Sequence, residues 1–287
     1  MRMMLYPHVF YLGQNRLAKE GWNMRDIRLC DDSQLESAAK LCVENHLGME
    51  IQAFHDPYLE NPDRLVQRYQ KLLMDIPGQK SLHAPFWDLN LGTKMRGIRR
   101  ETMEMFQYAY RLAKLLGCTE LIVHNGYIPG TSFPAGWVQR AVDFWQAFFQ
   151  DKDNTITVCI ENQFEEDGEI IQMEIDAVGD PRLKACLDIG HAHANSATSV
   201  QNWICALGER IHYFHLHNNH GKQPVKGYNS DEHLGLADGT IPIKSVLSLA
   251  QTICPNAIWA IECSTEYVEE SVDFLKKAGY LPLPNDG

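Results

Sequence analysis

Short apolar runs with the composition of buried strands alternate with longer amphipathic runs along most of this chain. The strand-like runs lie at 49–54, 79–84, 120–125, 155–162, 183–190, 210–218 and 257–263, and helix-like runs separate them. Repeated strand–helix units fold into a parallel sheet with right-handed crossovers. Seven or eight such units within 287 residues favour a closed (β/α)8 barrel over an open doubly wound sheet.

The beginning of the chain carries a weaker version of this pattern. The run at 4–13 is the best candidate for the first strand, and a helix is expected near 33–46. No Pro/Gly/Ser-rich linker or low-complexity segment divides the chain. We therefore expect residues 1–287 to form a single α/β domain with the TIM-barrel fold.

Nine imidazole and carboxylate side chains lie at or just beyond the ends of these strand-like runs. The carboxyl ends of barrel strands meet on one face, where the functional sites of such barrels are found. Mixed nitrogen and oxygen donors suit divalent ions such as Zn²⁺, Mn²⁺, Mg²⁺ or Co²⁺. The nine candidate metal ligands are His83, His124, Glu161, Asp188, His191, His215, Asp231, His233 and Glu262.

Four of the nine occupy equivalent positions on the last four strand-like runs. They are Glu161, Asp188, His215 and Glu262. Taken singly, each has an ordinary structural explanation, because a carboxylate after a strand often caps the next helix and a buried histidine is often part of the packing. Four such residues in register on consecutive strands favour a shared metal site.

The remaining candidates come from turns and from one unusual loop. His191 lies three residues beyond its strand-end aspartate, which keeps both above the same strand. In the long polar loop at 218–241, Asp231 and His233 form a chelating pair if the backbone is extended. Loops of this length in compact domains are often functional. We assign His217 a supporting or exposed role rather than a place among the ligands.

The charge balance bears on possible partners. With 26 Lys+Arg against 37 Asp+Glu, the net charge is −11, which makes nucleic acid an unlikely partner because such binding depends on neutralising phosphates. None of the 8 cysteines forms a C-x-x-C pair, so we expect most to be small buried side chains in a reducing compartment. Neither a signal peptide nor a membrane-length apolar run is evident. We expect a soluble cytoplasmic protein.

In combination, these motifs resemble the xylose isomerase-like TIM-barrel superfamily. That superfamily holds sugar (phosphate) isomerases and epimerases together with endonuclease IV, the apurinic-site enzyme of AP endonuclease family 2. The resemblance covers roughly residues 80–265 and rests on the segments "HAPF", "VHNG", "IEN", "LDIGHAH", "HLHNN", "DEHLGLADG" and "AIEC".

The two branches of the superfamily imply different metal contents. In the epimerase-like pattern, one metal is held by the residues matching Glu161, Asp188, His215 and Glu262. The endonuclease-like pattern implies three metals: one on His83, His124 and Glu161, a second on the same four residues as above, and a third on His191, Asp231 and His233.

Local differences separate the chain from both branches. The segment "ENQFEED" lacks the Asn-Arg-aromatic-Glu run of tagatose epimerase-like enzymes, and no arginine follows Arg210. The segments "HNG" and "HLHN" differ from the "HPG" and "HLND" of the endonuclease. The motifs therefore indicate the superfamily more clearly than the branch.

Two enzyme functions follow from the resemblance and the donor set. The first is a metal-dependent isomerase or epimerase of a small sugar, polyol or sugar phosphate, with Glu161, Glu262 and His191 as catalytic residues and one to three divalent ions per chain. The second is a di- or trinuclear phosphoester hydrolase resembling endonuclease IV. A non-enzymatic barrel that keeps its ligands is less favoured, since structural zinc sites usually contain cysteine.

Overall fold

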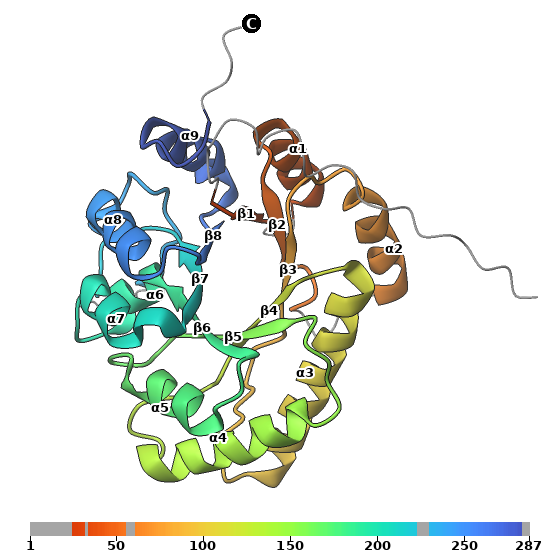
Figure 1. Ribbon diagram of the computed structural model, residues 1–287, viewed down its shortest axis with the longest axis vertical. Helices are drawn as coiled ribbons and strands as arrows, with labels where there is room; N and C mark the ends of the chain where they lie inside the picture. Colours follow the sequence, from red (N-terminus) through yellow and green to blue (C-terminus); the bar gives the residue numbers. More distant parts are fainter. Residues whose placement is uncertain (1–24, 32–33, 56–60, 223–229, 283–287) are drawn as a thin grey trace, which may run out of the picture.

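The computed structural model describes residues 25–31, 34–55, 61–222 and 230–282. Eight parallel strands close into a barrel in the order β1 to β8, with the helices outside the ring (Figure 1). The strands are β1 Ile27–Cys30, β2 Gly48–Ile51, β3 Lys80–His83, β4 Glu120–His124, β5 Thr157–Glu161, β6 Leu183–Asp188, β7 Ile211–Leu216 and β8 Ile258–Ile261. The predicted (β/α)8 barrel is confirmed.

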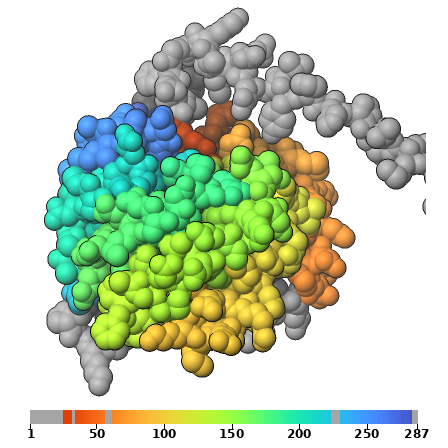
Figure 2. Space-filling model, turned by 60° about the horizontal axis from the view of Figure 1, so that its bottom comes forward, coloured from red at the N-terminus to blue at the C-terminus, as the bar shows by residue number. Residues whose placement is uncertain are grey.

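The helices follow the strands in the expected alternation, with two helices between β6 and β7. Side by side, α3, α4 and α5 form a continuous outer surface (Figure 2). The helices are α1 Leu35–Asn45, α2 Pro62–Leu72, α3 Arg96–Leu116, α4 Pro134–Phe149, α5 Glu169–Val178, α6 Ile189–Asn195, α7 Val200–Leu207, α8 Ile243–Ile253 and α9 Val268–Lys277. Among the described residues, no helix combines the length and apolar character needed to cross a bilayer.

The first barrel strand is not where the sequence pattern placed it. The run at 4–13 lies outside the described residues, and β1 pairs with β2 on one side and β8 on the other, so the position predicted for the first strand was wrong. The strand is only four residues long and carries a charged residue, Arg28, which hides its apolar character. That guanidinium is fully buried inside the barrel, where it pairs with Asp26 and Glu120.

Two apolar layers hold the barrel together. Between the strands and the helices, Trp137, Trp145, Trp203 and Trp259 are fully buried. Inside the barrel lies a smaller cluster that includes Cys30, Cys159 and Cys186. All the cysteines are free, and all but Cys205 are buried, which confirms that most serve as small apolar side chains.

Strand register aligns the predicted ligands at one end of the barrel. His124 is the β-partner of Glu161 on the next strand, and Asp188 is the β-partner of His215. Glu262 directly follows β8, and its backbone N–H donates to Leu216 O at the end of β7. The carboxyl ends of β4 to β8 therefore deliver these side chains to a single layer.

A buried carboxyl outside this layer gives a pH prediction. Glu174 on α5 accepts hydrogen bonds from Trp145 Nε1 (2.5 Å) and Asn125 Nδ2 (3.3 Å). Burial, assisted by the charge of Glu165, raises the pKa of Glu174 to about 8 despite these bonds. The folded protein therefore binds a proton that the unfolded chain loses at about pH 4.5, so this stabilisation is complete at low pH and lost as pH rises through 8.

We expect Glu174→Gln to flatten the decline in the free energy of unfolding between about pH 5 and pH 8, a decline of about 3 to 4 kcal/mol. Urea titrations across this range measure the effect. The exposed control Glu169→Gln on the same helix should keep the unsubstituted pH slope. A Glu174→Gln slope equal to that of the control would contradict the assignment.

Candidate metal centre

The nine predicted ligands meet at the carboxyl end of the barrel, in three adjoining clusters. Within each cluster, the potential donor atoms lie within 4.8 Å of one another. The first cluster is His83, His124 and Glu161; the second is Glu161, Asp188, His215 and Glu262; the third is His191, His217, Asp231 and His233. Every predicted residue belongs to at least one cluster.

In the first cluster, two imidazoles face one carboxylate oxygen. Nε2 of His83 and Nε2 of His124 each lie 3.1 Å from Glu161 Oε2. Nδ1–H of His83 donates to Ala84 O at 2.8 Å, which leaves its Nε2 as the metal-binding nitrogen. Phe86 stacks on His124 with ring centroids 4.8 Å apart and covers one side of the cluster.

In the second cluster, three carboxylates surround one imidazole nitrogen. Nδ1 of His215 lies 3.2 Å from Glu161 Oε1, 3.1 Å from Glu262 Oε2 and 3.7 Å from Asp188 Oδ2. The two oxygens of Glu161 thus face different clusters, so this side chain links the first to the second. Asp188 also caps α6 by accepting from the backbone N–H of His191 at 2.6 Å, so its ordinary structural explanation holds alongside its place in the cluster.

One residue of β2 and one just after it form hydrogen bonds to members of this cluster. Neither of them was identified from the sequence. Glu50 is fully buried, and both its carboxylate oxygens lie 3.0 Å from His215 Nε2. Because Glu50 accepts the proton of Nε2, the lone pair of His215 is on Nδ1 and faces the other carboxylates. Gln52 donates its amide to Oε1 of Glu262. Their only sequence signal was a polar residue at alternate positions of the run 49–54.

We expect Glu50→Gln to weaken divalent metal binding at the second cluster about 10- to 100-fold, because a carboxamide no longer fixes this tautomer of His215. Calorimetric titration of chelator-treated protein with Mn²⁺ measures the affinity. Glu44→Gln, on the exposed face of α1, is the matched control and should bind as the unsubstituted protein does. Equal affinity in both variants would rule out this role for Glu50.

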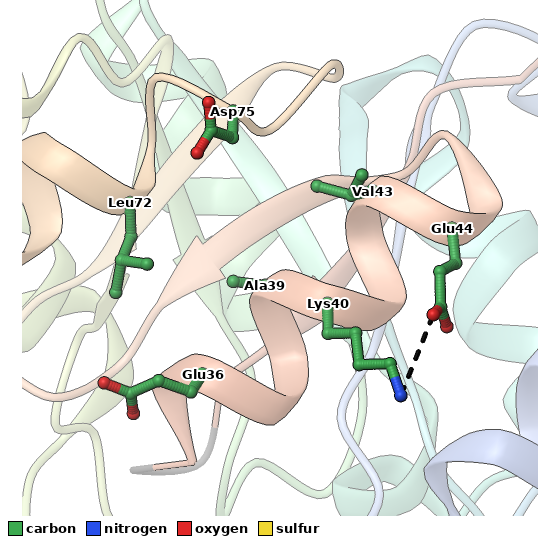
Figure 3. A pocket seen from close by; sticks show the side chains of 7 residues that line it. All are labelled: Glu36, Ala39, Lys40, Val43, Glu44, Leu72 and Asp75. Atoms are coloured by element: carbon green, nitrogen blue, oxygen red, sulfur yellow. Dashed lines mark ion pairs between the residues drawn. The ribbon is translucent and has the colours of Figure 1, made fainter.

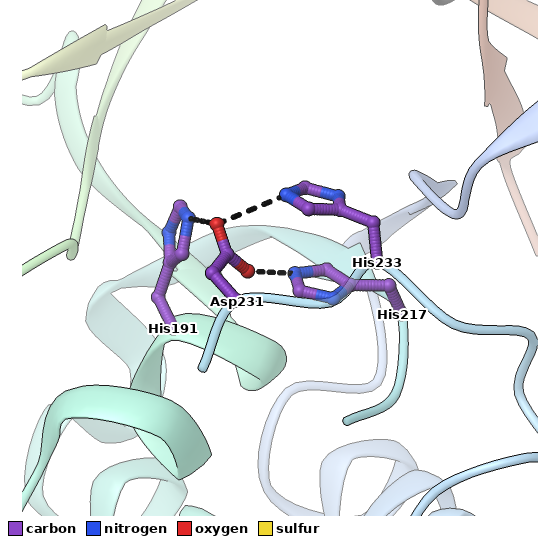
Figure 4. A group of neighbouring side chains, drawn as sticks. All are labelled: His191, His217, Asp231 and His233. Carbon is purple, nitrogen blue, oxygen red and sulfur yellow. Dashed lines mark hydrogen bonds and ion pairs between the residues drawn. The ribbon is translucent and has the colours of Figure 1, made fainter. Parts of the chain in front are cut away.

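The third cluster centres on Asp231 (Figure 4). Its Oδ2 lies 3.2 Å from His191 Nε2 and 3.1 Å from His233 Nε2, and its Oδ1 lies 3.8 Å from His217 Nε2. The other ring nitrogens of two of these histidines are fixed by the backbone: His191 Nδ1–H donates to Asn162 O and His233 Nδ1–H donates to Glu262 O. Both therefore present Nε2 to Asp231.

The structure places His217, for which we expected a supporting or exposed role, beside the ligand candidates of the third cluster. It follows His215 by two residues at the end of β7, and side chains two apart on an extended chain point to the same side. It is fully buried and its ring stacks on His233 with centroids 4.0 Å apart. The two-residue spacing of His215 and His217 in "HLHN" is the sequence feature that places both rings on the same side.

The long loop after β7 is anchored next to the candidate ligands that it carries. Asn218 forms an isolated antiparallel bridge with Leu234. The side-chain amide of Asn218 donates to Leu236 O, and its carbonyl accepts from the N–H of Ile241. These bonds hold the second half of the loop against the barrel, which brings in Asp231 and His233.

Charge interactions within the clusters are strong. Burial would raise the pKa of Glu161, but His124 and His215 outweigh it and hold that pKa well below its usual value. The pKa of Glu262 rises to about 8 because of burial and of the charges on Glu161 and Asp188, although His215 opposes the rise. Burial favours neutral His233, yet its bond to Asp231 raises its pKa to about 10.

The donor set fits a divalent ion. Buried polar atoms are normally hydrogen-bonded, but His215 Nδ1 and Glu262 Oε2, which face each other in the second cluster, make no hydrogen bond. An imidazole with three carboxylates is a ligand set typical of Mn²⁺, Mg²⁺, Co²⁺ or Zn²⁺. Cys30 and Cys186 lie nearby, but burial raises the pKa of both thiols, which makes them poor ligands.

A separate groove lies on the outer surface between α1 and α2 (Figure 3). It is lined by Glu36, Ala39, Lys40, Val43, Glu44, Leu72 and Asp75. None of the three clusters contributes a side chain to it. The chemistry described above is therefore confined to the end of the barrel.

Comparisons with known proteins agree with this architecture. The model of the family described as xylose isomerase-like TIM barrel matches residues 35–278. The uncharacterized protein MJ1311 of Methanocaldococcus jannaschii is 27% identical over 273 residues, which cover 89% of this chain and 87% of that protein.

Two solved structures have the same fold. The TTHB071 protein of Thermus thermophilus, in crystals soaked with ZnCl2, has a TM-score of 0.70 at 23% identity and covers 88% of this chain and 97% of its own. A D-tagatose 3-epimerase-like protein has a TM-score of 0.70 at 21% identity, with coverages of 88% and 96%. The match of the family model over most of the chain means that this protein belongs to the xylose isomerase-like TIM barrel family.

Proposed function

We propose that this protein is a metal-dependent isomerase or epimerase that acts on a small sugar, polyol or sugar phosphate. The observation that carries this proposal is the second cluster, where Glu161 Oε1 and Glu262 Oε2 lie 3.2 and 3.1 Å from His215 Nδ1. Two carboxylates at one metal-binding position can serve both proton removal and proton return at the same carbon.

The proposed reaction transfers a proton at a carbon next to a carbonyl group. A divalent ion held by Glu161, Asp188, His215 and Glu262 would supply Lewis-acid polarisation of that carbonyl. One glutamate takes the proton from carbon and the other returns it. His191, whose Nδ1 lies 3.2 Å from Glu161 Oε1, orients the glutamate on β5.

The proposal is tested by proton exchange in D2O. Metal-loaded protein is incubated with a panel of ketoses, aldoses and sugar phosphates, and loss of the 1H signal at the carbon next to the carbonyl is followed by NMR. We expect exchange for at least one compound, and none after chelator treatment. No exchange across the panel with the metal fully loaded would contradict the proposal.

A phosphoester hydrolase is the second candidate, favoured by the adjacency of the three clusters. Glu161 belongs to both the first and the second, and His191 Nδ1 of the third approaches Glu161 Oε1. Adjacent metal positions suit in-line displacement at phosphorus. Cleavage of an abasic-site oligonucleotide or a model phosphodiester would favour this candidate, and the net charge of −11 makes the small phosphodiester the better substrate to try.

A further inference from the structure

We propose that Gln52 recognises the substrate. The nitrogen of its side-chain amide is held by Glu50 and Glu262, so its carbonyl oxygen is left at the carboxyl end of the barrel to accept a hydrogen bond from a substrate hydroxyl group. The inference rests on the proposed function, because it takes the substrate to be a hydroxylated carbonyl compound. It follows from the position of Gln52, from the direction of its amide and from the charge of its neighbours.

Gln52 lies just beyond the end of β2, on the side of the strand that faces the inside of the barrel. Side chains two apart on an extended chain point the same way, and Glu50, two residues earlier, lies inside the barrel against His215. A rise of about 3.3 Å per residue places Gln52 about 6 to 7 Å nearer the carboxyl end than Glu50. The side chain of Glu50 is fully buried, whereas that of Gln52 is half-buried, so Gln52 borders the space that a substrate would enter.

The direction of the Gln52 amide is fixed by the two carboxylates. Its Nε2 donates to Glu50 Oε1 at 3.2 Å and to Glu262 Oε1. A side-chain amide nitrogen has two hydrogens to donate, so these two bonds use both of them. A reversed amide would instead place its oxygen against two carboxylate oxygens. The carbonyl oxygen therefore points away from Glu50 and Glu262.

The backbone of Gln52 is also held in place. Its N–H donates to Asp31 Oδ1 at 3.1 Å, and Asp31 accepts a further hydrogen bond from the hydroxyl group of Tyr69. Its backbone carbonyl accepts from the N–H of His55 at 3.0 Å. Because Asp31 and Tyr69 are buried, the position of Gln52 is set before a substrate arrives, and binding does not have to order this residue.

The side-chain carbonyl oxygen of Gln52 is available to a ligand. Within the part of the chain that the structure describes, no residue donates a hydrogen bond to this Oε1. An amide oxygen accepts hydrogen bonds and cannot donate them, and the carboxylates of Glu50 and Glu262 beside it repel anions. The position therefore selects a neutral donor such as a hydroxyl group, and a phosphate group of the substrate would have to lie elsewhere.

The bond to Glu262 indicates which part of the substrate Gln52 contacts. Oε2 of Glu262 lies 3.1 Å from His215 Nδ1, while Oε1 accepts from Gln52. In the proposed reaction Glu262 exchanges a proton with a substrate carbon, so that carbon must touch this carboxylate. Hydroxyl groups on the same carbon or on an adjoining one then come within reach of Gln52. A ligand that lacks the contacted hydroxyl should bind more weakly, because it leaves the acceptor without a partner.

Combined protein and ligand variants separate recognition from a purely structural bridge between the two carboxylates. Binding of D-fructose and of its 1-deoxy, 3-deoxy and 4-deoxy analogues to Mg²⁺-loaded protein is measured by ligand-observed NMR, which requires no turnover. We expect one analogue to bind the unsubstituted protein about fivefold more weakly than D-fructose does. In Gln52→Met, which keeps the length of the side chain but lacks the acceptor, that analogue and D-fructose should bind equally.

Gln146→Met, at an exposed position on α4, is the matched control and should keep the fivefold preference. An equal loss of affinity for D-fructose and all three analogues in Gln52→Met would overturn the proposal, since a structural bridge predicts that result. Absence of D-fructose binding to the unsubstituted protein would overturn it as well.

A second measurement covers the case in which Gln52→Met does not fold. Unsubstituted protein is labelled with 13C at the side-chain carbonyl of glutamine, and D-fructose must shift the Gln52 signal more than the weaker analogue does. An unshifted signal overturns the proposal. Proton exchange in D2O is followed on the same samples, so that hydroxyl-specific binding without exchange would contradict the proposed isomerase and leave the role of Gln52 in recognition intact.

Discussion

Replacing Glu161 with glutamine is expected to abolish catalysis and to disturb two metal positions at once. The two oxygens of Glu161 serve different clusters, with Oε2 facing His83 and His124 and Oε1 facing His215. A neutral carboxamide removes one negative charge from both clusters and offers only one oxygen donor. We expect the rate of substrate turnover to fall by about a thousandfold or more, together with a loss of bound metal.

The measurement pairs elemental analysis with the proton-exchange assay. Glu166→Gln, at an exposed position on the loop after β5, is the control. It should bind as much metal as the unsubstituted protein and exchange the substrate proton at the same rate. If Glu161→Gln bound the full complement of metal and exchanged at the unsubstituted rate, the central place of this carboxylate would be refuted. Circular dichroism checks that the variant is folded, so that a loss of metal can be attributed to the substitution and not to misfolding.

Replacing Glu262 with glutamine is expected to have the second largest effect, and a different one. The side chain is 12% exposed, so it borders the open face of the barrel. Glutamine keeps the shape and the bond from Gln52, but it can neither accept nor release a proton. We therefore expect exchange of the substrate C–H in D2O to fall about 10²- to 10⁴-fold, with metal affinity changed much less than in Glu161→Gln.

Glu266→Gln provides the matched control, because it lies four residues on, in the exposed turn Thr265–Tyr267. It should exchange at the unsubstituted rate. Undiminished exchange in metal-loaded Glu262→Gln would remove this residue from the proton-transfer pair. A loss explained wholly by weaker metal binding would be recognised by recovery of the rate at saturating metal.

The sequence predicted the barrel well because its signals are local. Buried parallel strands are short continuous apolar runs, and those ending at His124 or Glu161 stand out without any tertiary information. The first strand did not stand out, because Arg28 interrupts its apolar run and is compensated by Glu120, which lies far away in sequence on β4. Such pairing across the barrel is invisible to local periodicity.

The same distinction explains which parts of the site could be predicted. Strand ends can be recognised from sequence, so the nine candidate ligands could be named, and their convergence follows from parallel register. Glu50 acts through His215, 165 residues away, and nothing local identifies that pairing. His217 was passed over because its neighbour on the same strand already filled the expected position, and the place of its ring depends on Gly190 of another unit.

The divided carboxylate of Glu161 makes the first two clusters thermodynamically dependent on each other. An ion that draws the electron density of one oxygen alters the affinity of the other oxygen for a second ion, and by reciprocity the coupling free energy is the same in both directions. We therefore expect metal loading of this barrel to proceed as a sequence of unequal steps. The occupancy of one cluster should then set the metal concentration at which the next one fills.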